Sequence, residues 1–215
     1  MTVEKKPGRL AINAAVVPQT AALIGEAVER TGAVLSGHFS FLRGTHVDTA
    51  LRFRAIGRDS ESVAMVAREL AAIASWDWKG AKVLCPESAG FFLGYEVAAC
   101  KDVPCAVVKT DLRRIPTSEL IAGEVNKGDR IVLVNDIGNT GRSLEPMLSL
   151  IKEHSATVVG VLLFAVVDEK AFLSFCNEQK LQAHYLTIAL WESVSPTECT
   201  GCREGAALVP ILELS

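Results

Sequence analysis

A carboxylate and a run of small polar residues follow a short apolar segment in the middle of the chain. Residues 131–134 are Ile-Val-Leu-Val, and Asn135 and Asp136 come directly after them. A carboxylate at the end of a strand can accept hydrogen bonds from sugar hydroxyls or from water on a metal ion. Backbone amides of small-residue loops and of helix starts bind phosphate. The residues that we expect to share such a site are Asn135, Asp136, Ile137, Gly138, Asn139, Thr140, Gly141, Arg142 and Ser143.

The apolar segment before Asp136 is typical of a strand that is covered on both faces, because its residues do not alternate with polar ones. In open α/β sheets, ligands bind at the carboxyl ends of such strands. We expect Ser143 to cap a helix over residues 144–153. An ordinary strand–turn–helix crossover remains an alternative, since Asn, Gly and Asp also form turns. The segment lacks the Gly-Lys-Ser/Thr of a P-loop and the Gly-x-Gly-x-x-Gly of a dinucleotide site.

The same segment resembles the phosphoribosyl-diphosphate motif of the type I phosphoribosyltransferases. In that motif, four apolar residues precede two acids, two variable residues and Thr-Thr-Gly-x-Ser/Thr. Asn135 replaces the first acid, and Asn139 replaces the first threonine. The positions that match are Asp136, Thr140, Gly141 and Ser143.

Other segments resemble this family in the same order along the chain, and they are closest to the orotate type. Residues 31–39 and 44–48 resemble its amino-terminal hairpin, which implies that His38 and His46 lie near the base pocket. Residues 86–90 resemble the diphosphate loop, and residues 107–109 resemble the strand that leads into the flexible loop. Residues 196–205 resemble a carboxyl-terminal tail with Cys-x-x-Cys.

Some positions depart from the orotate pattern. The loop over residues 109–118 has no histidine, and Leu42 and Ala50 replace a polar and an aromatic residue. Glu169 lies near the position of an arginine that holds the orotate carboxylate. A negative charge there repels an anionic base. The sugar-phosphate side of the pattern is therefore mostly kept, whereas the base side is changed.

The resemblance implies transfer of phosphoribose from phosphoribosyl diphosphate to a nitrogenous base, with release of diphosphate. It also implies Mg²⁺ bound through the diphosphate, a homodimer, and a cytoplasmic role in pyrimidine biosynthesis. A regulatory or binding protein that keeps the pocket without catalysis is an alternative, and a purine-type transferase is a third reading. The further residues to which the resemblance gives roles are Lys109 and Arg113 in catalysis, beside Asp136, and Ser88, Ala89, Gly90 and Arg114 in substrate binding.

The six cysteines divide into two groups. Cys199 and Cys202 form a Cys-x-x-Cys pair. Two thiols alone are compatible with three interpretations: a turn with free thiols, a disulfide, or half of a metal site. The other four lie in apolar surroundings and are expected in the core: Cys85, Cys100, Cys105 and Cys176.

Composition limits the class of protein. The chain has 215 residues, 49% of them hydrophobic, which suits a single domain over residues 1–215. We expect residues 1–55 and the carboxyl-terminal tail to form a small hood. A net charge of −3 gives no general attraction to nucleic acid. Residues 1–7 lack the apolar core of a signal peptide, and no apolar run reaches the roughly 18 residues that span a membrane.

Alternating strand and helix patterns predict an α/β fold with a mostly parallel central sheet flanked by helices and a small amino-terminal hairpin hood. Residues 1–17 are expected to be a lead-in, and residues 111–128 a long connection. The pattern predicts strands over 83–85, 104–108, 131–134, 157–167 and 184–189, helices over 19–30, 60–75, 90–100, 144–153 and 169–178, and a hairpin over 36–41 and 46–53.

Overall fold

The computed structural model describes residues 10–41, 44–191 and 193–214. A seven-stranded sheet with the strand order β1-β9-β8-β7-β4-β5-β6 forms its centre, and all strands except the two at the edges run parallel. Its strands are β1 (Leu10–Ile12), β4 (Ala81–Pro86), β5 (Cys105–Thr110), β6 (Pro116–Ala122), β7 (Arg130–Gly138), β8 (Thr157–Val166) and β9 (Ala183–Ala189).

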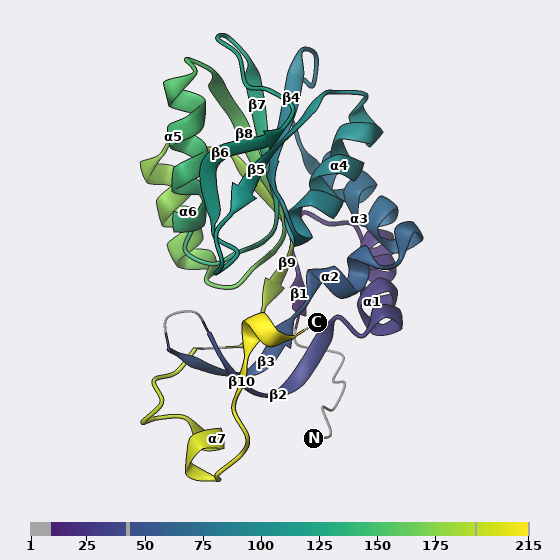
Figure 1. The fold of residues 1–215 in the computed structure, drawn as a ribbon. Coiled ribbons are helices and arrows are strands. Elements are labelled where there is room, and N and C mark those ends of the chain that lie inside the picture. The colour runs from purple at the N-terminus through teal and green to yellow at the C-terminus, as the bar shows by residue number, and fades with distance from the viewer. Residues whose placement is uncertain (1–9, 42–43, 192, 215) are drawn as a thin grey trace.

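Helices cover both faces of this sheet (Figure 1). One face carries α3 (Ser60–Ile73) and α4 (Ala89–Lys101), and the other carries α5 (Glu145–Glu153) and α6 (Glu169–Glu178). The side chains of β7 alternate between two apolar clusters: Val132 and Val134 face the first layer, and Ile131 and Leu133 face the second. This double burial explains why residues 131–134 have no polar alternation.

A second, three-stranded sheet lies below the first (Figure 1), with the strand order β10-β2-β3. The hairpin strands β2 (Val34–Ser40) and β3 (His46–Leu51) run antiparallel, and β10 (Val209–Pro210) from the tail pairs with β2. The remaining elements are α1 (Pro18–Thr31), α2 (Phe53–Gly57), α7 (Thr200–Arg203) and the 3₁₀ turns η1 (Arg142–Leu144) and η2 (Ile211–Glu213).

The predicted fold class is confirmed, and most predicted elements lie where the pattern places them. Five helices and strands are absent from the prediction: β1, α2, β6, α7 and β10. Residues 10–12 of the expected lead-in form β1, which pairs with β9, and residues 116–122 of the expected connection form β6 on the opposite edge. Edge strands such as β6 keep polar residues exposed, which hides the apolar pattern. The helix α2, five residues long, is also absent from the prediction.

Two local predictions are wrong. Ser143 lies within η1 rather than capping α5, whose N-cap is Leu144 and has no capping side chain. Cys100 is exposed at the end of α4, whereas Cys85 and Cys176 are buried as expected and Cys105 is half-buried. Among the described residues, none of the helices is both long enough and apolar enough to cross a bilayer.

Candidate active site

The strand order changes direction between β4 and β7. From β4 the chain continues outward to β5, and from β7 it continues to β8 on the other side. Loops that leave two such strands diverge, so a crevice opens at their carboxyl ends. A cavity of about 1430 Å³ lies there. It is lined by the loop after β4, the loop after β7, the ends of β8 and β9, the turn at residues 113–116, and parts of the hairpin and tail.

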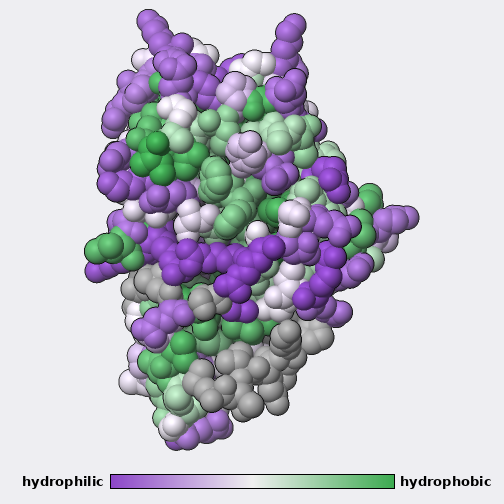
Figure 2. Space-filling view, turned by 45° about the vertical axis from the view of Figure 1, so that its right-hand side comes forward, coloured by the Kyte–Doolittle hydropathy of each residue, from purple (hydrophilic) through white to green (hydrophobic). Residues whose placement is uncertain are grey.

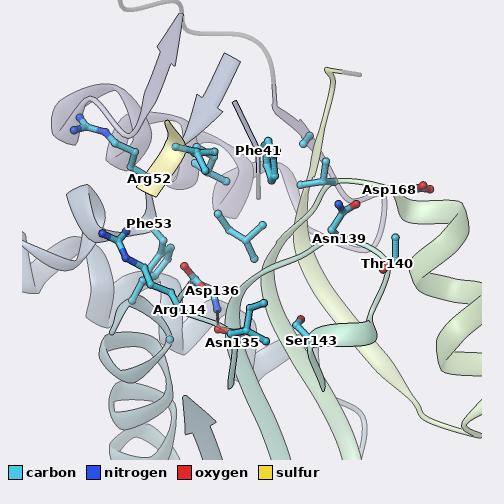
Figure 3. A pocket seen from close by; sticks show the side chains of 18 of the residues that line it. Phe41, Arg52, Phe53, Arg114, Asn135, Asp136, Asn139, Thr140, Ser143 and Asp168 are labelled. Atoms are coloured by element: carbon cyan, nitrogen blue, oxygen red, sulfur yellow. Dashed lines mark hydrogen bonds between the residues drawn. The ribbon is translucent and has the colours of Figure 1, made fainter. Parts of the chain in front are cut away.

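Asp136 is a half-buried carboxylate at the end of β7 (Figure 3). Burial raises the pKa of its side chain from 3.8 to about 6. The amides of Ile137 and Asp136 and the positive charge of Arg54 act in the opposite direction. The Asp136 amide also donates to Asn135 Oδ1 at 2.8 Å. The carboxylate is therefore mostly ionised at neutral pH, and it faces the cavity as a hydrogen-bond acceptor.

The loop after β7 curves round one side of the cavity (Figure 3). The carboxyl end of β7 and this loop together supply the lining residues Asn135, Asp136, Ile137, Asn139, Thr140, Arg142 and Ser143. Gly141 does not line the cavity, but the turn depends on it: its φ is +82°, and an added Cβ would lie 2.3 Å from Phe175 Cδ1. The predicted grouping of this loop around Asp136 is therefore present, with Gly138 and Gly141 supporting it from behind.

The loop between β4 and α4 forms the facing wall. Ser88, Ala89 and Gly90 all line the cavity, and α4 begins at Ala89, so its first amides lie at this wall. Ser88 has φ +76°, an unfavourable conformation for a residue with a side chain. An added Cβ at Gly90 would lie 2.6 Å from Asn135 Oδ1, so only glycine lets the two loops approach this closely.

Four arginines lie near these two loops. Arg113 and Arg114, which the resemblance singled out, line the cavity, as do Arg52 and Arg54. Arg54 Nη2 donates to Ser88 Oγ at 3.1 Å. Burial, and to a lesser extent the positive charge of Arg54, lowers the pKa of Arg114. No motif pointed to Arg52 and Arg54. Their position directly after a hairpin strand is the only signal in the sequence.

Lys109 lies outside this group. Its Nζ is 3.1 Å from Glu119 Oε2 on the neighbouring strand β6, its side chain is 49% exposed, and it does not line the cavity. The structure brings all the predicted site residues to this cavity except three: Gly138, Gly141 and Lys109 do not line it.

Acidic residues balance the arginines. The charged lining residues are Arg52, Arg54, Arg113, Arg114 and Arg142 against Glu87, Asp136, Glu145, Asp168 and Glu169. Glu169 accepts a hydrogen bond from the Tyr185 hydroxyl, and Asp168 caps α6 through the Ala171 amide at 3.0 Å. The wall beneath is apolar, with Phe41 from the hairpin and Ile211 and Leu214 from the tail.

Comparison with known proteins identifies the class of protein to which this chain belongs. Residues 58–173 match the model of the phosphoribosyl transferase domain. The orotate phosphoribosyltransferase of Caldanaerobacter subterraneus is 28% identical over 193 residues, which cover 86% of this chain and 93% of the relative. That of Pelotomaculum thermopropionicum is 26% identical over 183 residues, covering 84% and 91%.

Solved structures agree on the fold. Orotate phosphoribosyltransferase of Mycobacterium tuberculosis, in complex with inorganic phosphate, superposes with a TM-score of 0.62 at 22% identity, covering 81% of this chain and 97% of that one. The chain therefore belongs to the phosphoribosyl transferase domain family. It is a phosphoribosyltransferase that resembles the orotate type, and these relatives favour the transferase over a non-catalytic binding protein.

Proposed function

We propose that this chain transfers phosphoribose from phosphoribosyl diphosphate to a ring nitrogen of a base and releases diphosphate. One observation carries the proposal: the Asp136 carboxylate and the loop at residues 137–143 face the loop at residues 88–90 across a single cavity. As the leaving group departs, the sugar carbon becomes cationic. The protein then has to orient the sugar, neutralise the leaving group and exclude water, since little covalent chemistry is required of it.

We assign roles by position in the cavity. Asp136 accepts hydrogen bonds from the ribose hydroxyls, and the amides of residues 138–143 bind the 5′-phosphate. The amides of Ser88, Ala89 and Gly90 bind the diphosphate. Arg113 and Arg114 add positive charge beside it, because guanidinium groups bind phosphate oxygens in pairs.

The balance of charge in the cavity supports a role for Mg²⁺. Five arginines and five acids line it, so the lining by itself does not neutralise the phosphates of the substrate. Mg²⁺ prefers oxygen ligands and binds readily to phosphates. Bound through the diphosphate, it supplies the positive charge that stabilises the departing group.

The acceptor base is assigned to the apolar wall formed by the hairpin and tail. The names of the relatives make orotate the first base to test, in a reaction of cytoplasmic pyrimidine nucleotide biosynthesis. Glu169 opposes an anionic base in this cavity. We therefore expect this protein to prefer orotate over uracil less strongly than it would with an arginine at position 169.

Lys109 requires a second copy of the chain if it is to be catalytic. It pairs with Glu119 away from its own cavity, at the base of the turn that carries Arg113. We propose that a homodimer places this turn over the neighbouring cavity. Aromatic residues for such an interface are exposed on α4, where Phe91, Phe92 and Tyr95 are 39%, 40% and 55% exposed. Figure 2 shows apolar side chains on the upper half of one face, above a hydrophilic band.

The test is a diphosphate-release assay with phosphoribosyl diphosphate, Mg²⁺ and each of orotate, uracil, adenine and hypoxanthine. We expect release with a pyrimidine base and a nucleotide product of matching mass. Calorimetry with phosphoribosyl diphosphate and Mg²⁺ accompanies it. Binding without release for any of the four bases would refute the catalytic proposal and support a binding protein.

A further inference from the structure

Four side chains of metal-binding type meet between the hairpin and the tail, outside the cavity. His38 comes from β2 and His46 from β3, whereas Cys199 and Cys202 flank the start of α7. One ligand atom from each lies within 4.8 Å of all the others. None of the four lines the cavity, although Thr45, the residue before His46, does. Figure 1 shows α7 beside the hairpin, at the end of the molecule away from the main sheet.

Four of the six distances between these atoms are close to those of a tetrahedral zinc site. His38 Nε2 lies 3.0 Å from His46 Nδ1 and 3.3 Å from Cys199 Sγ, and Cys202 Sγ lies 3.6 Å and 3.2 Å from the same two nitrogens. Zinc binds nitrogen at about 2.0–2.1 Å and sulfur at about 2.3 Å. In a tetrahedral site, two nitrogen ligands are then about 3.3 Å apart, and a nitrogen and a sulfur ligand are about 3.6 Å apart. The observed separations lie within a few tenths of an ångström of these values.

The surroundings hold one histidine in the form that a metal needs. His38 Nδ1 lies 3.0 Å from the carbonyl oxygen of Ala206, so it donates its proton there and leaves the lone pair of Nε2 directed at the other three atoms. Gly201, between the two cysteines, packs on the His38 ring: an added Cβ would lie 2.7 Å from its Cγ. The Cys-x-x-Cys turn can therefore reach the ring only with glycine at this position.

The part of the tail between Val194 and Val209 has little else to hold it, whereas Val209, Ile211 and Leu214 pack against the main core. All residues from 193 to 211 are described, and Cys199 is the only one of them that is buried. The helix α7 buries none of its four residues. Backbone pairing joins the tail to the hairpin at Val194 with His46 and at β10 with β2, which brackets the loop without giving it a core. Small structures without a core usually depend on a metal or a disulfide.

We propose that His38, His46, Cys199 and Cys202 bind one zinc ion that fastens the carboxyl-terminal tail to the hairpin. Two imidazoles and two thiolates favour Zn²⁺ over Mg²⁺ or Ca²⁺, which prefer oxygen ligands. Each thiol loses its proton to solvent when its sulfur binds the ion. Because Ile211 and Leu214 follow in the same tail and line the cavity, the zinc site also holds one wall of the active site in place.

The test measures metal on the whole, reduced protein. After dialysis against EDTA, elemental analysis should find about one zinc per chain in the unchanged protein and less than about a tenth of that in Cys199→Ser and in Cys202→Ser. The control is Cys100→Ser, which alters an exposed thiol outside the cluster and should keep its zinc. Replacement of zinc by Co²⁺ should give thiolate charge-transfer bands and the visible bands of tetrahedral cobalt.

A second measurement uses the unchanged protein, so that the proposal can still be tested if the variants fail to fold. Titration with a mercurial reagent that binds thiolates should release zinc, and trypsin should then cleave at exposed Arg203 at least about tenfold faster. Zinc below about a tenth of an equivalent in reduced protein, with no tetrahedral cobalt spectrum, would overturn the proposal. In protein purified without reductant, a mass two hydrogens lower, with Cys199 and Cys202 joined, would overturn it in favour of a disulfide. All of these readouts are independent of transferase activity.

Discussion

Replacement of Asp136 by asparagine separates what this residue does for activity from what it does for stability. The raised pKa, about 6 against 3.8 for an ordinary aspartate, means that folding disfavours the ionised form. This difference corresponds to about 3 kcal/mol at most. Because the carboxyl group is partly exposed, we expect its ionisation to lower the free energy of unfolding by about 1–3 kcal/mol. Asparagine keeps an oxygen that can accept from the Ile137 amide, but it carries no charge.

The pH dependence has a definite sign. A carboxyl group whose pKa is higher in the folded state does not lower the free energy of unfolding below pH 3.8, where it is protonated in both states. Its destabilising effect grows between pH 3.8 and 6 and is complete above pH 6. Asp136→Asn should therefore be more stable than the unchanged protein by about 1–3 kcal/mol at pH 7.5, with this gain nearly absent at pH 4. Each kcal/mol corresponds to about 2–4 °C in melting temperature.

Activity should change in the opposite direction. Loss of a charged acceptor for the ribose hydroxyls should lower kcat/KM by about 100-fold at pH 7.5. Denaturant unfolding at pH 4, 5, 6 and 7.5 and diphosphate release with phosphoribosyl diphosphate measure the two effects on the same preparations. If Asp136→Asn is less stable at pH 7.5, or if its advantage does not depend on pH, the buried-carboxylate argument is wrong. If it keeps full activity, the assigned role of Asp136 is wrong.

Further predictions concern the phosphate loop, the arginines and the dimer. Gly141→Ala should lower the free energy of unfolding by about 2–4 kcal/mol, because it adds a clash with Phe175 to the strain of positive φ. The control is Gly128→Ala, which has φ +84° but no atom near its Cβ position and should cost about 1 kcal/mol. Denaturant unfolding measures both variants. Arg54→Ala should raise the KM for phosphoribosyl diphosphate by at least about tenfold, because it removes a charge beside Ser88, and unchanged steady-state kinetics would contradict this placement. If Lys109 acts across a dimer, mixing inactive Lys109→Ala subunits with inactive Asp136→Asn subunits should restore about a quarter of the activity. Half of the dimers are then mixed, and each mixed dimer has one intact site out of two. No recovery after verified subunit exchange would contradict the dimer proposal.

The local pattern of the chain was sufficient for the main sheet. Residues 131–134 are apolar without alternation because β7 is buried on both faces, and this is visible in the sequence alone. The loop that follows could be predicted for a similar reason: a carboxylate and two glycines after a buried strand restrict both backbone and chemistry. The short or exposed elements β1, β6 and α2 could not be predicted, because they bury too little surface to leave a pattern.

The sequence by itself determined that Asp136 and its loop lie together, since these residues are neighbours on one chain segment. Only the tertiary structure decided which distant residues join them. Arg54 reaches the cavity because α2 follows the hairpin, and Lys109 misses it because β6 turns back and pairs its charge with Glu119. In the same way, Cys199 and Cys202 acquired two histidine partners more than 150 positions away. Contacts of this range depend on how elements pack, and no local spacing records them.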